Sequence, residues 1–298
     1  MNDSVLLTVF VPLAMFILML GLGSNLNTQA LTEALKNKSV IWMGLIAQVV
    51  IVPACAAIVV MFMDMPNEFK LGIMLLACCP GGTTSNLFTH LGKGNLALSV
   101  ALTTFSSLLV IITMPIILST SSELIFNEAR EFDIPEIEIL KRLFFMTILP
   151  IMLGIFIRHQ YPRVGKFISS KTGVFGLAFL VFLTSVVVVN EWDNLLKYLS
   201  VIGMTIFLLN VSIVSVVMLM LKISPPNLQD RFTIYIEANI QSSALAMFIA
   251  LTVLESGSMV AIPAGGYTLT MYLVGGILTL SHRHQKRKSL TAAESVAV

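Results

Sequence analysis

Two polar stretches lie inside hydrophobic segments of this 298-residue sequence, and they hold the side chains best suited to chemistry. The first is residues 78–86, CCPGGTTSN, and the second is residues 237–243, EANIQSS. Pro-Gly-Gly breaks a helix, because proline lacks a backbone donor and glycine frees the backbone dihedral angles. A carboxylate within hydrocarbon is energetically unfavourable, so Glu237 at the start of the second stretch predicts a functional site.

The two breaks predict a site for ions. An interrupted helix leaves carbonyl groups without partners on one side of the gap and N–H groups without partners on the other. Carbonyl, carboxylate and side-chain oxygens form a hard site for a small cation, whereas N–H groups and the positive end of a helix dipole suit an anion. The side chains available near the two breaks, besides Glu237, are Thr83, Thr84, Ser85, Asn86, Asn239, Gln241, Ser242 and Ser243.

Three polar side chains in other hydrophobic segments extend this set. Ser99 and Thr103 lie one helical turn apart on one face, and Gln48 lies within an apolar run. Simpler interpretations stay open for each: a hydroxyl can bond to the carbonyl one turn back, and an amide can join two helices. For Asn210, in a later hydrophobic segment, we favour a helix–helix contact.

Membrane-spanning helices must position these residues, because the sequence is 56% hydrophobic and only 11% charged. Soluble domains carry about 25% charged residues. At about 20 apolar residues for each crossing, the sequence predicts an all-α integral membrane protein of about nine transmembrane helices. The expected spans are 5–23, 40–62, 70–90, 95–118, 142–158, 173–190, 198–221, 232–252 and 263–281.

The connections between these spans are short, which predicts one membrane domain over residues 1–281 and a basic tail over residues 282–298. Placing the N-terminus outside puts thirteen of the eighteen Lys and Arg residues in inner loops and the tail. The positive-inside rule therefore predicts an outer N-terminus and a cytoplasmic C-terminus. The tail, HRHQKRK at 282–288, suits an anionic membrane surface, and we expect no nucleic-acid partner.

The order of the spans predicts that the two interrupted segments cross the membrane in opposite directions. With nine spans, the third segment would run inward and the eighth outward. Paired interruptions that cross the membrane in opposite directions are typical of inverted-repeat secondary transporters, whose binding sites lie near the midplane.

The sequence does not favour an enzyme. Ser242 and Ser243 have no histidine partner in the same segments, because the four histidines lie at or beyond the ends of the spans. The Pro-Gly-Gly stretch lacks the following Lys and Ser or Thr of a phosphate loop. We therefore expect no catalytic residues.

From about Leu20 to about Ile277 the sequence resembles the bile acid:sodium symporter (BASS) family. The motifs that carry the resemblance are CPGGTTSN at 79–86, GNLALS at 94–99 and EANIQSS at 237–243. The resemblance implies a core domain in which two interrupted helices cross, and a panel domain against which the core moves. The panel would comprise spans 5–23, 142–158 and 173–190, and the core would comprise residues 40–118 and 198–281.

The resemblance also implies two sodium sites that share Glu237. The first would consist of Ser85, Asn86, Ser99, Thr103 and Glu237. The second would consist of Gln48, Glu237 and Gln241 with the main-chain oxygens of Ala238 and Ile240.

The substrate contacts depart from the family pattern. Members that take bile acids often have Asn where this chain has Ser242, and some bacterial members have His-Asn where this chain has Tyr272 and Leu273. We expect substrate contacts from Thr83, Thr84, Asn239, Ser242, Ser243 and Tyr272.

These features predict a sodium-coupled symporter of a small organic anion, either bile acid-like or a small carboxylate. It would move about two Na+ per substrate by alternating access. We expect it in the plasma membrane, specifically the inner membrane of a bacterium. Three alternatives stay open: a proton-coupled transporter that uses Glu237 as the carrier, a membrane receptor that binds a small ligand without moving it, and a passive channel.

Overall fold

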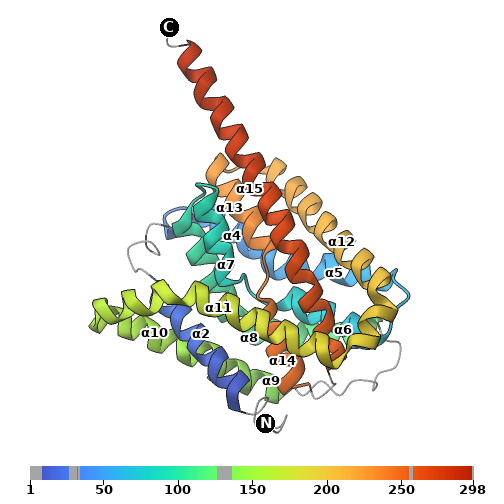
Figure 1. Ribbon diagram of the computed structural model, residues 1–298. Coiled ribbons are helices and arrows are strands. Elements are labelled where there is room, and N and C mark those ends of the chain that lie inside the picture. The colour runs from blue at the N-terminus through green and yellow to red at the C-terminus, as the bar shows by residue number, and fades with distance from the viewer. Residues whose placement is uncertain (1–8, 27–31, 33, 126–135, 255–257, 297–298) are drawn as a thin grey trace.

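The computed structural model describes residues 9–26, 32, 34–125, 136–254 and 258–296, and for 122–125, 136 and 288–296 it describes the backbone only. Within these residues the chain consists of helices joined by turns, with a single isolated β-bridge (Figure 1). Six helical segments are long and apolar enough to cross a membrane: Lys38–Met61, Leu96–Ser121, Ile137–Gln160, Pro162–Asn190, Trp192–Ile223 and Ser258–Arg287.

Two of the six segments contain a π-helical turn, in which the backbone hydrogen bonds run to the fifth residue back. The elements that make up the six segments are α4 (Lys38–Ile46), η2 (Ala47–Ile51), α5 (Val52–Met61), α8 (Leu96–Ile125), α9 (Glu136–Leu143), η3 (Phe144–Ile148), α10 (Leu149–Gln160), α11 (Pro162–Asn190), α12 (Trp192–Ile223), η4 (Ser258–Ala261) and α15 (Ile262–Val296). The π turns are η2 and η3.

The remaining predicted spans correspond to shorter helices. The third is divided into α6 (Asn67–Cys78) and α7 (Thr83–Leu91), and the eighth into α13 (Leu228–Asn239) and α14 (Ser243–Thr252). The first corresponds to α2 (Val11–Asn25), of which 15 residues are helical. Because each of these helices is shorter than a full crossing, the count of nine transmembrane segments stays a prediction.

Two helices extend beyond the hydrophobic segments from which their spans were predicted. Helix α11 begins at Pro162 instead of residue 173, and α15 continues to Val296, through most of the region predicted to be a separate tail. The added turns are polar, so a hydropathy pattern does not register them although the backbone remains helical. The connection between the fourth and fifth predicted spans is partly helical too, in α8 and α9, while residues 126–135 lie outside the described part.

Helices α2, α10 and α11 pack against one another on one side of the molecule (Figure 1). The contact between α2 and α10 depends on small residues: a β-carbon on Gly23 would collide with the carbonyl oxygen of Ile151, and one on Gly154 with that of Leu20. The hydroxyl of Ser24 also donates to the carbonyl of Gly154 at 3.3 Å. Close backbone approach at small residues is the usual basis of helix association in membranes.

Gly154→Ala is therefore expected to destabilise the protein. The added methyl group meets the backbone of α2, and overpacking of this kind costs about 1–3 kcal/mol. The thermal unfolding midpoint of the purified protein should fall by several degrees. Gly173→Ala on α11 is the matched control, because nothing lies within 4 Å of a β-carbon at that position. Equal midpoints for the two variants would contradict the close α2–α10 contact.

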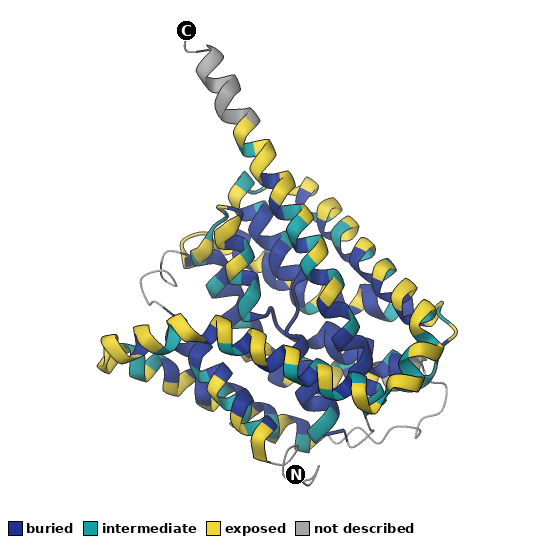
Figure 2. Ribbon diagram, viewed as in Figure 1, coloured by how far each residue is buried: buried dark blue, intermediate teal, exposed yellow. Residues whose placement is uncertain are grey.

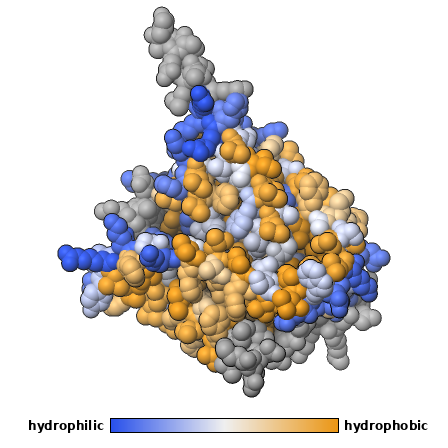
Figure 3. All heavy atoms as spheres, in the orientation of Figure 1, coloured by the Kyte–Doolittle hydropathy of each residue, from blue (hydrophilic) through white to orange (hydrophobic). Residues whose placement is uncertain are grey.

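The outer faces of the bundle are apolar. On α12 the side chains of Phe207 and Leu219 are exposed, and on α15 those of Leu269 and Leu273 are exposed. Figure 2 shows that buried residues concentrate where the short helices meet, and Figure 3 shows apolar side chains over much of the visible surface. Exposed apolar faces around a buried polar centre are the arrangement expected of a protein within lipid.

Candidate functional site: the crossing of the interrupted helices

The two interruptions meet in the interior as extended backbone. Gly81 and Gln241 form an antiparallel β-bridge. The N–H of Gly82 donates to the carbonyl of Ile240 at 3.2 Å, and the N–H of Ser242 donates to that of Pro80 at 2.9 Å. Each break thus satisfies backbone groups of the other. The crossing brings the C-terminal ends of α6 and α13 and the N-terminal ends of α7 and α14 to one place.

Glu237 lies at this crossing, in the last turn of α13, and only 2% of its surface is exposed. Three hydroxyl groups approach its carboxylate. Ser85 on α7 donates to Oε1 at 2.7 Å, Ser99 on α8 donates to the same oxygen through a very short hydrogen bond, and Thr103 on α8 donates to Oε2 at 3.0 Å. Within the part of the chain that the structure describes, the one salt bridge lies elsewhere, between Arg142 and Glu138.

The hydroxyl protons at this site are too few for the acceptors around them. The hydroxyl of Ser85 also lies 2.8 Å from the carbonyl of Gly82, and that of Thr103 lies 3.0 Å from the carbonyl of Ser99. Each hydroxyl has one proton, so three protons face five short contacts between oxygens. A buried carboxylate with incomplete hydrogen bonding needs a positive charge nearby. The site therefore suits a cation.

Gly81→Ala is expected to weaken this cation site. A β-carbon on Gly81 would collide with Oε2 of Glu237, so the carboxylate must move away from Thr103. An overpacking penalty of about 1.4 kcal/mol corresponds to a tenfold change in affinity. The sodium concentration that half-saturates thermal stabilisation of the purified protein should rise about tenfold. Gly203→Ala, with open space around the new methyl group, should leave it unchanged, and the same value in both variants would contradict the prediction.

A second group of oxygens lies beside Gln48. This residue belongs to the π turn η2 and is 5% exposed. Its Nε2 donates to the carbonyl of Cys79 at 3.0 Å and to Oε1 of Gln241 at 2.6 Å, and Nε2 of Gln241 donates to the carbonyl of Ala238 at 2.8 Å. These bonds join three elements at the crossing. The interpretation of Gln48 as a helix–helix contact is therefore correct as far as its amide nitrogen is concerned.

Three buried amide oxygens near the crossing have no hydrogen-bond partner among the described residues, namely Oε1 of Gln48, Oδ1 of Asn86 and Oδ1 of Asn239. Buried polar atoms are nearly always paired, so each such exception calls for an explanation. Amide oxygens are ligands for hard cations. Within the described residues no cluster of three or more His, Cys, Asp or Glu side chains could hold a metal ion. The donors at the crossing are oxygens, which suit a hard cation.

A narrow cavity of about 30 Å³ borders the crossing, and five of the six residues predicted to contact substrate line it: Thr83, Thr84, Ser242, Ser243 and Tyr272. The ring of Tyr272 stacks on Phe88 with centroids 5.8 Å apart. The opposite wall comes from α2 and α11 and includes Leu18, Met19 and Gly176. These wall residues were not predicted, since nothing in their types distinguishes them from lipid-facing residues.

Asn239 faces away from this cavity. Its Nδ2 donates to Oδ1 of Asn210 on α12 at 2.9 Å, and its carbonyl accepts the hydroxyl of Tyr267 at 2.8 Å. Nδ2 of Asn210 in turn lies 3.1 Å from Oγ1 of Thr270 on α15. The interpretation of Asn210 as a helix–helix contact is confirmed. Asn239 does not join the residues that line the cavity, and Tyr267 is a positioning residue that the sequence analysis missed.

The π turn at Gln48 was also missed, although the sequence carries a signal for it. Proline lacks an N–H group and clashes with the carbonyl four residues back, and a shift to fifth-residue bonding relieves this conflict. Pro53 follows η2 and Pro150 follows η3, each two residues after the π turn ends. A proline inside a hydrophobic span is a weak signal, since it follows both π turns but Pro115 lies within α8 without one.

Comparison with known proteins gives several relatives of similar character. The chain is 28% identical over 288 residues to the uncharacterized sodium-dependent transporter YocS of Bacillus subtilis, covering 96% of this chain and 87% of that protein. It is 27% identical over 272 residues to the probable chloroplastic sodium/metabolite cotransporter BASS2 of Oryza sativa, covering 90% of this chain and 62% of that protein. It is 28% identical over 184 residues to the human ileal sodium/bile acid cotransporter, covering 62% and 52%.

These relatives are named as sodium-dependent transporters or cotransporters, which agrees with a buried carboxylate suited to a cation and with apolar outer faces. The sequence model of the sodium bile acid symporter family matches residues 12–198, well over half of the chain. The chain belongs to the sodium bile acid symporter family.

Proposed function

We propose that this protein couples the inward movement of one small organic anion to that of about two sodium ions. The single observation that carries the proposal is the geometry of Glu237. Its carboxylate is only 2% exposed, is surrounded by hydroxyl groups, and forms no salt bridge with a cationic side chain among the described residues. A positive ion offsets that charge. The first ion would be held by Glu237, Ser85, Asn86, Ser99 and Thr103.

A second ion would be held by Gln48, Gln241 and Glu237 with the main-chain oxygens of Ala238 and Ile240. Support comes from the oxygen of Gln48, which has no partner, and from the short bond that already joins Gln48 to Gln241. The amide of Gln241 now occupies the carbonyl of Ala238, so it would rotate to present its own oxygen when the ion binds.

The anion would bind where the cavity meets the two helix N-termini. Helices α7 and α14 begin at Thr83 and Ser243, and neither start has a side-chain cap. The N–H groups of Ser85 and Ser243 already bond to nearby carbonyls, so an anion would be attracted by the other first-turn N–H groups and by the positive helix ends. Leu18 and Met19 offer apolar contact for its carbon skeleton. No basic side chain lines the cavity, so bound sodium would supply the remaining positive charge and make ion and substrate binding interdependent.

Alternating access accounts for the small size of the cavity. Pockets for small molecules are usually about 300–1,000 Å³, whereas this one is about 30 Å³. A panel of α2, α10 and α11 would separate from a core built from the other helices. The two interrupted helices would be related as an inverted repeat, with the site between them. Their mutual backbone pairing would keep the crossing intact while the panel moves.

The proposed stoichiometry provides enough driving force for uphill transport. A tenfold sodium gradient is worth about 1.4 kcal/mol per ion, and one net positive charge entering at 100 mV adds about 2.3 kcal/mol. Two ions and one monovalent anion then supply roughly 5 kcal/mol, which supports accumulation on the order of a thousandfold. The distribution of Lys and Arg supports a plasma membrane, bacterial in our proposal, with the C-terminus on the cytoplasmic side.

Uptake into proteoliposomes tests this function. Labelled organic anions, first chosen by a thermal-shift screen with and without sodium, should accumulate only with an inward sodium gradient. Accumulation above the external concentration excludes a passive channel, and any uptake excludes a receptor that does not transport. Uptake that ignores sodium and follows a pH gradient would instead establish proton coupling through Glu237.

The amide side chains distinguish sodium from protons, because an amide oxygen ligates sodium but cannot carry a proton. Asn86→Leu and Gln241→Leu should each raise the half-saturating sodium concentration about tenfold, the value of one lost ligand of about 1.4 kcal/mol. Asn194→Leu, whose amide bonds to Glu191 outside the site, is the matched control. Unchanged sodium dependence in both site variants would refute the proposed ligand sets.

A further inference from the structure

A second group of unpaired polar atoms lies at the other end of α13, away from the crossing. Nε of Arg231 and the hydroxyl of Tyr235, one turn apart on α13, are buried, and so is Nε2 of His282 on α15. None of the three has a hydrogen-bond partner among the described residues. All three residues line one cavity of about 120 Å³. Three unpaired donors around a single cavity are unusual, because isolated exceptions are already rare. The three atoms themselves are enclosed, so a ligand in the cavity would bond to them after a small rotation of the side chains.

The cavity has a polar end and an apolar side. Ser281 and Gln285 of α15 add polar groups to the lining, while Met218 of α12 and Leu278 of α15 provide apolar contact. The ring of His282, which is 4% exposed, stacks on Phe232 with centroids 4.3 Å apart and planes 16° apart. This stacking holds the imidazole in place beside the cavity.

The donors select an anion with several oxygens. Arginine stays charged and presents a planar set of N–H groups that matches phosphate. The hydroxyl of Tyr235 and the ring nitrogen of His282 can each donate one more hydrogen bond. No carboxylate lines the cavity to compete for the guanidinium group.

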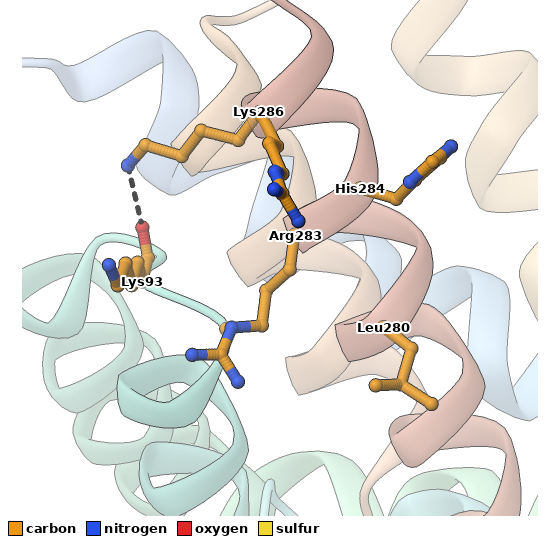
Figure 4. Close-up of a pocket in the computed structure, with 7 residues that line it drawn as sticks. Lys93, Leu280, Arg283, His284 and Lys286 are labelled. Carbon is orange, nitrogen blue, oxygen red and sulfur yellow. Dashed lines mark hydrogen bonds between the residues drawn. The ribbon is translucent and has the colours of Figure 1, made fainter. Parts of the chain in front are cut away.

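A second cavity with a basic lining lies at the same end of the molecule. On the other flank of α15, a separate cavity of about 530 Å³ is lined by Lys93, Arg283, His284, Lys286 and Arg287. Figure 4 shows Lys286 reaching the turn after α7, where it donates to the carbonyl of Lys93 at 3.5 Å. The exposed apolar faces of α12 and α15 border the smaller cavity. Basic pockets between transmembrane helices on the cytoplasmic side are suited to lipid headgroups.

We propose that the cavity between α12, α13 and α15 binds a phosphate group through Arg231, Tyr235 and His282. The phosphate can come from a phospholipid headgroup or from free phosphate, and the apolar lining favours the lipid. Because Arg231 and Tyr235 lie on the helix that ends beside Glu237, a bound phosphate ties this helix to α15.

Native mass spectrometry of the purified full-length protein tests the site, with phosphatidylglycerol, diacylglycerol and inorganic phosphate as separate probes. Phosphatidylglycerol should bind and diacylglycerol should not. Arg231→Gln should weaken phosphatidylglycerol binding about tenfold, the size of one charged hydrogen bond. Arg283→Gln removes the same charge from the other flank of α15 and should leave binding unchanged. Inorganic phosphate that binds the unmodified chain and not Arg231→Gln identifies free phosphate as a source.

Tyr235→Phe keeps the charge and removes one donor, so it carries the test if Arg231→Gln does not fold. It should weaken phosphatidylglycerol binding about threefold, within the range of a neutral hydrogen bond. Equal weakening by Arg231→Gln and Arg283→Gln would show general surface attraction and overturn the proposal. So would equal binding of phosphatidylglycerol and diacylglycerol, or unchanged phosphatidylglycerol binding in Tyr235→Phe. None of these readouts depends on transport, so the proposed function stands or falls separately.

Discussion

Glu237→Gln is expected to reduce sodium-driven uptake at least a hundredfold. Glutamine keeps the shape of the side chain, and its single amide oxygen can still accept hydrogen bonds from Ser85 and Ser99. Its NH2 group cannot accept from Thr103, and the negative charge that offsets the ions is gone. Removing one member of a buried charge pair costs about 3–5 kcal/mol, which corresponds to a factor of a hundred or more. Both proposed ion sites share this carboxylate, so the loss cannot be compensated by the other site.

The measurement is initial uptake into proteoliposomes under a fixed inward sodium gradient, with thermal stabilisation by sodium as a second readout that does not need the substrate. Glu138→Gln is the matched control, since this carboxylate forms a partly exposed ion pair with Arg142 and pairs of that kind contribute little. Sodium-dependent uptake by Glu237→Gln within a few fold of the unmodified chain would remove the basis of the proposed mechanism.

A disulfide between α7 and α11 is expected to stop transport reversibly. A β-carbon on Gly176 of α11 would lie 3.4 Å from Oγ1 of Thr83 on α7. The sulfur of a cysteine at position 83 can take the place of this oxygen, which brings the two side chains within reach of a disulfide. The double variant Thr83→Cys with Gly176→Cys should cross-link the proposed panel to the core. If the panel must move away for substrate to enter, oxidation should lower uptake to background and a reducing agent should restore it.

The single variants, oxidised and reduced in the same way, are the controls, because Thr83 is itself a proposed substrate contact. The native cysteines Cys55, Cys78 and Cys79 are buried and free, so oxidation of the unmodified chain should leave uptake unchanged. Full uptake by a double variant whose cross-link is demonstrated by mass spectrometry would contradict movement between these two helices.

Local properties of the sequence were sufficient to predict the membrane class and the positions of the two breaks. The length of a hydrophobic segment determines whether a helix can span the lipid. Proline and glycine disrupt such a helix, and a carboxylate is costly within it. These are features of neighbouring residues, so Pro80, Gly81 and Glu237 could be singled out without a fold. Helix ends were less predictable, because the polar turns of α11 and α15 stay helical without contributing to hydropathy.

The tertiary structure decided which polar groups face one another. Glu237 bonds to residues 152 and 138 positions away, Ser85 and Ser99, and such contacts depend on how helices cross. Asn239, two residues further along α13, turns instead toward Asn210, although its type and place in the motif suited the cavity equally well. The reason is geometric. Within one short stretch, the turn of the helix and the extended break point successive side chains in different directions. Which group each side chain contacts then depends on the helices packed around it.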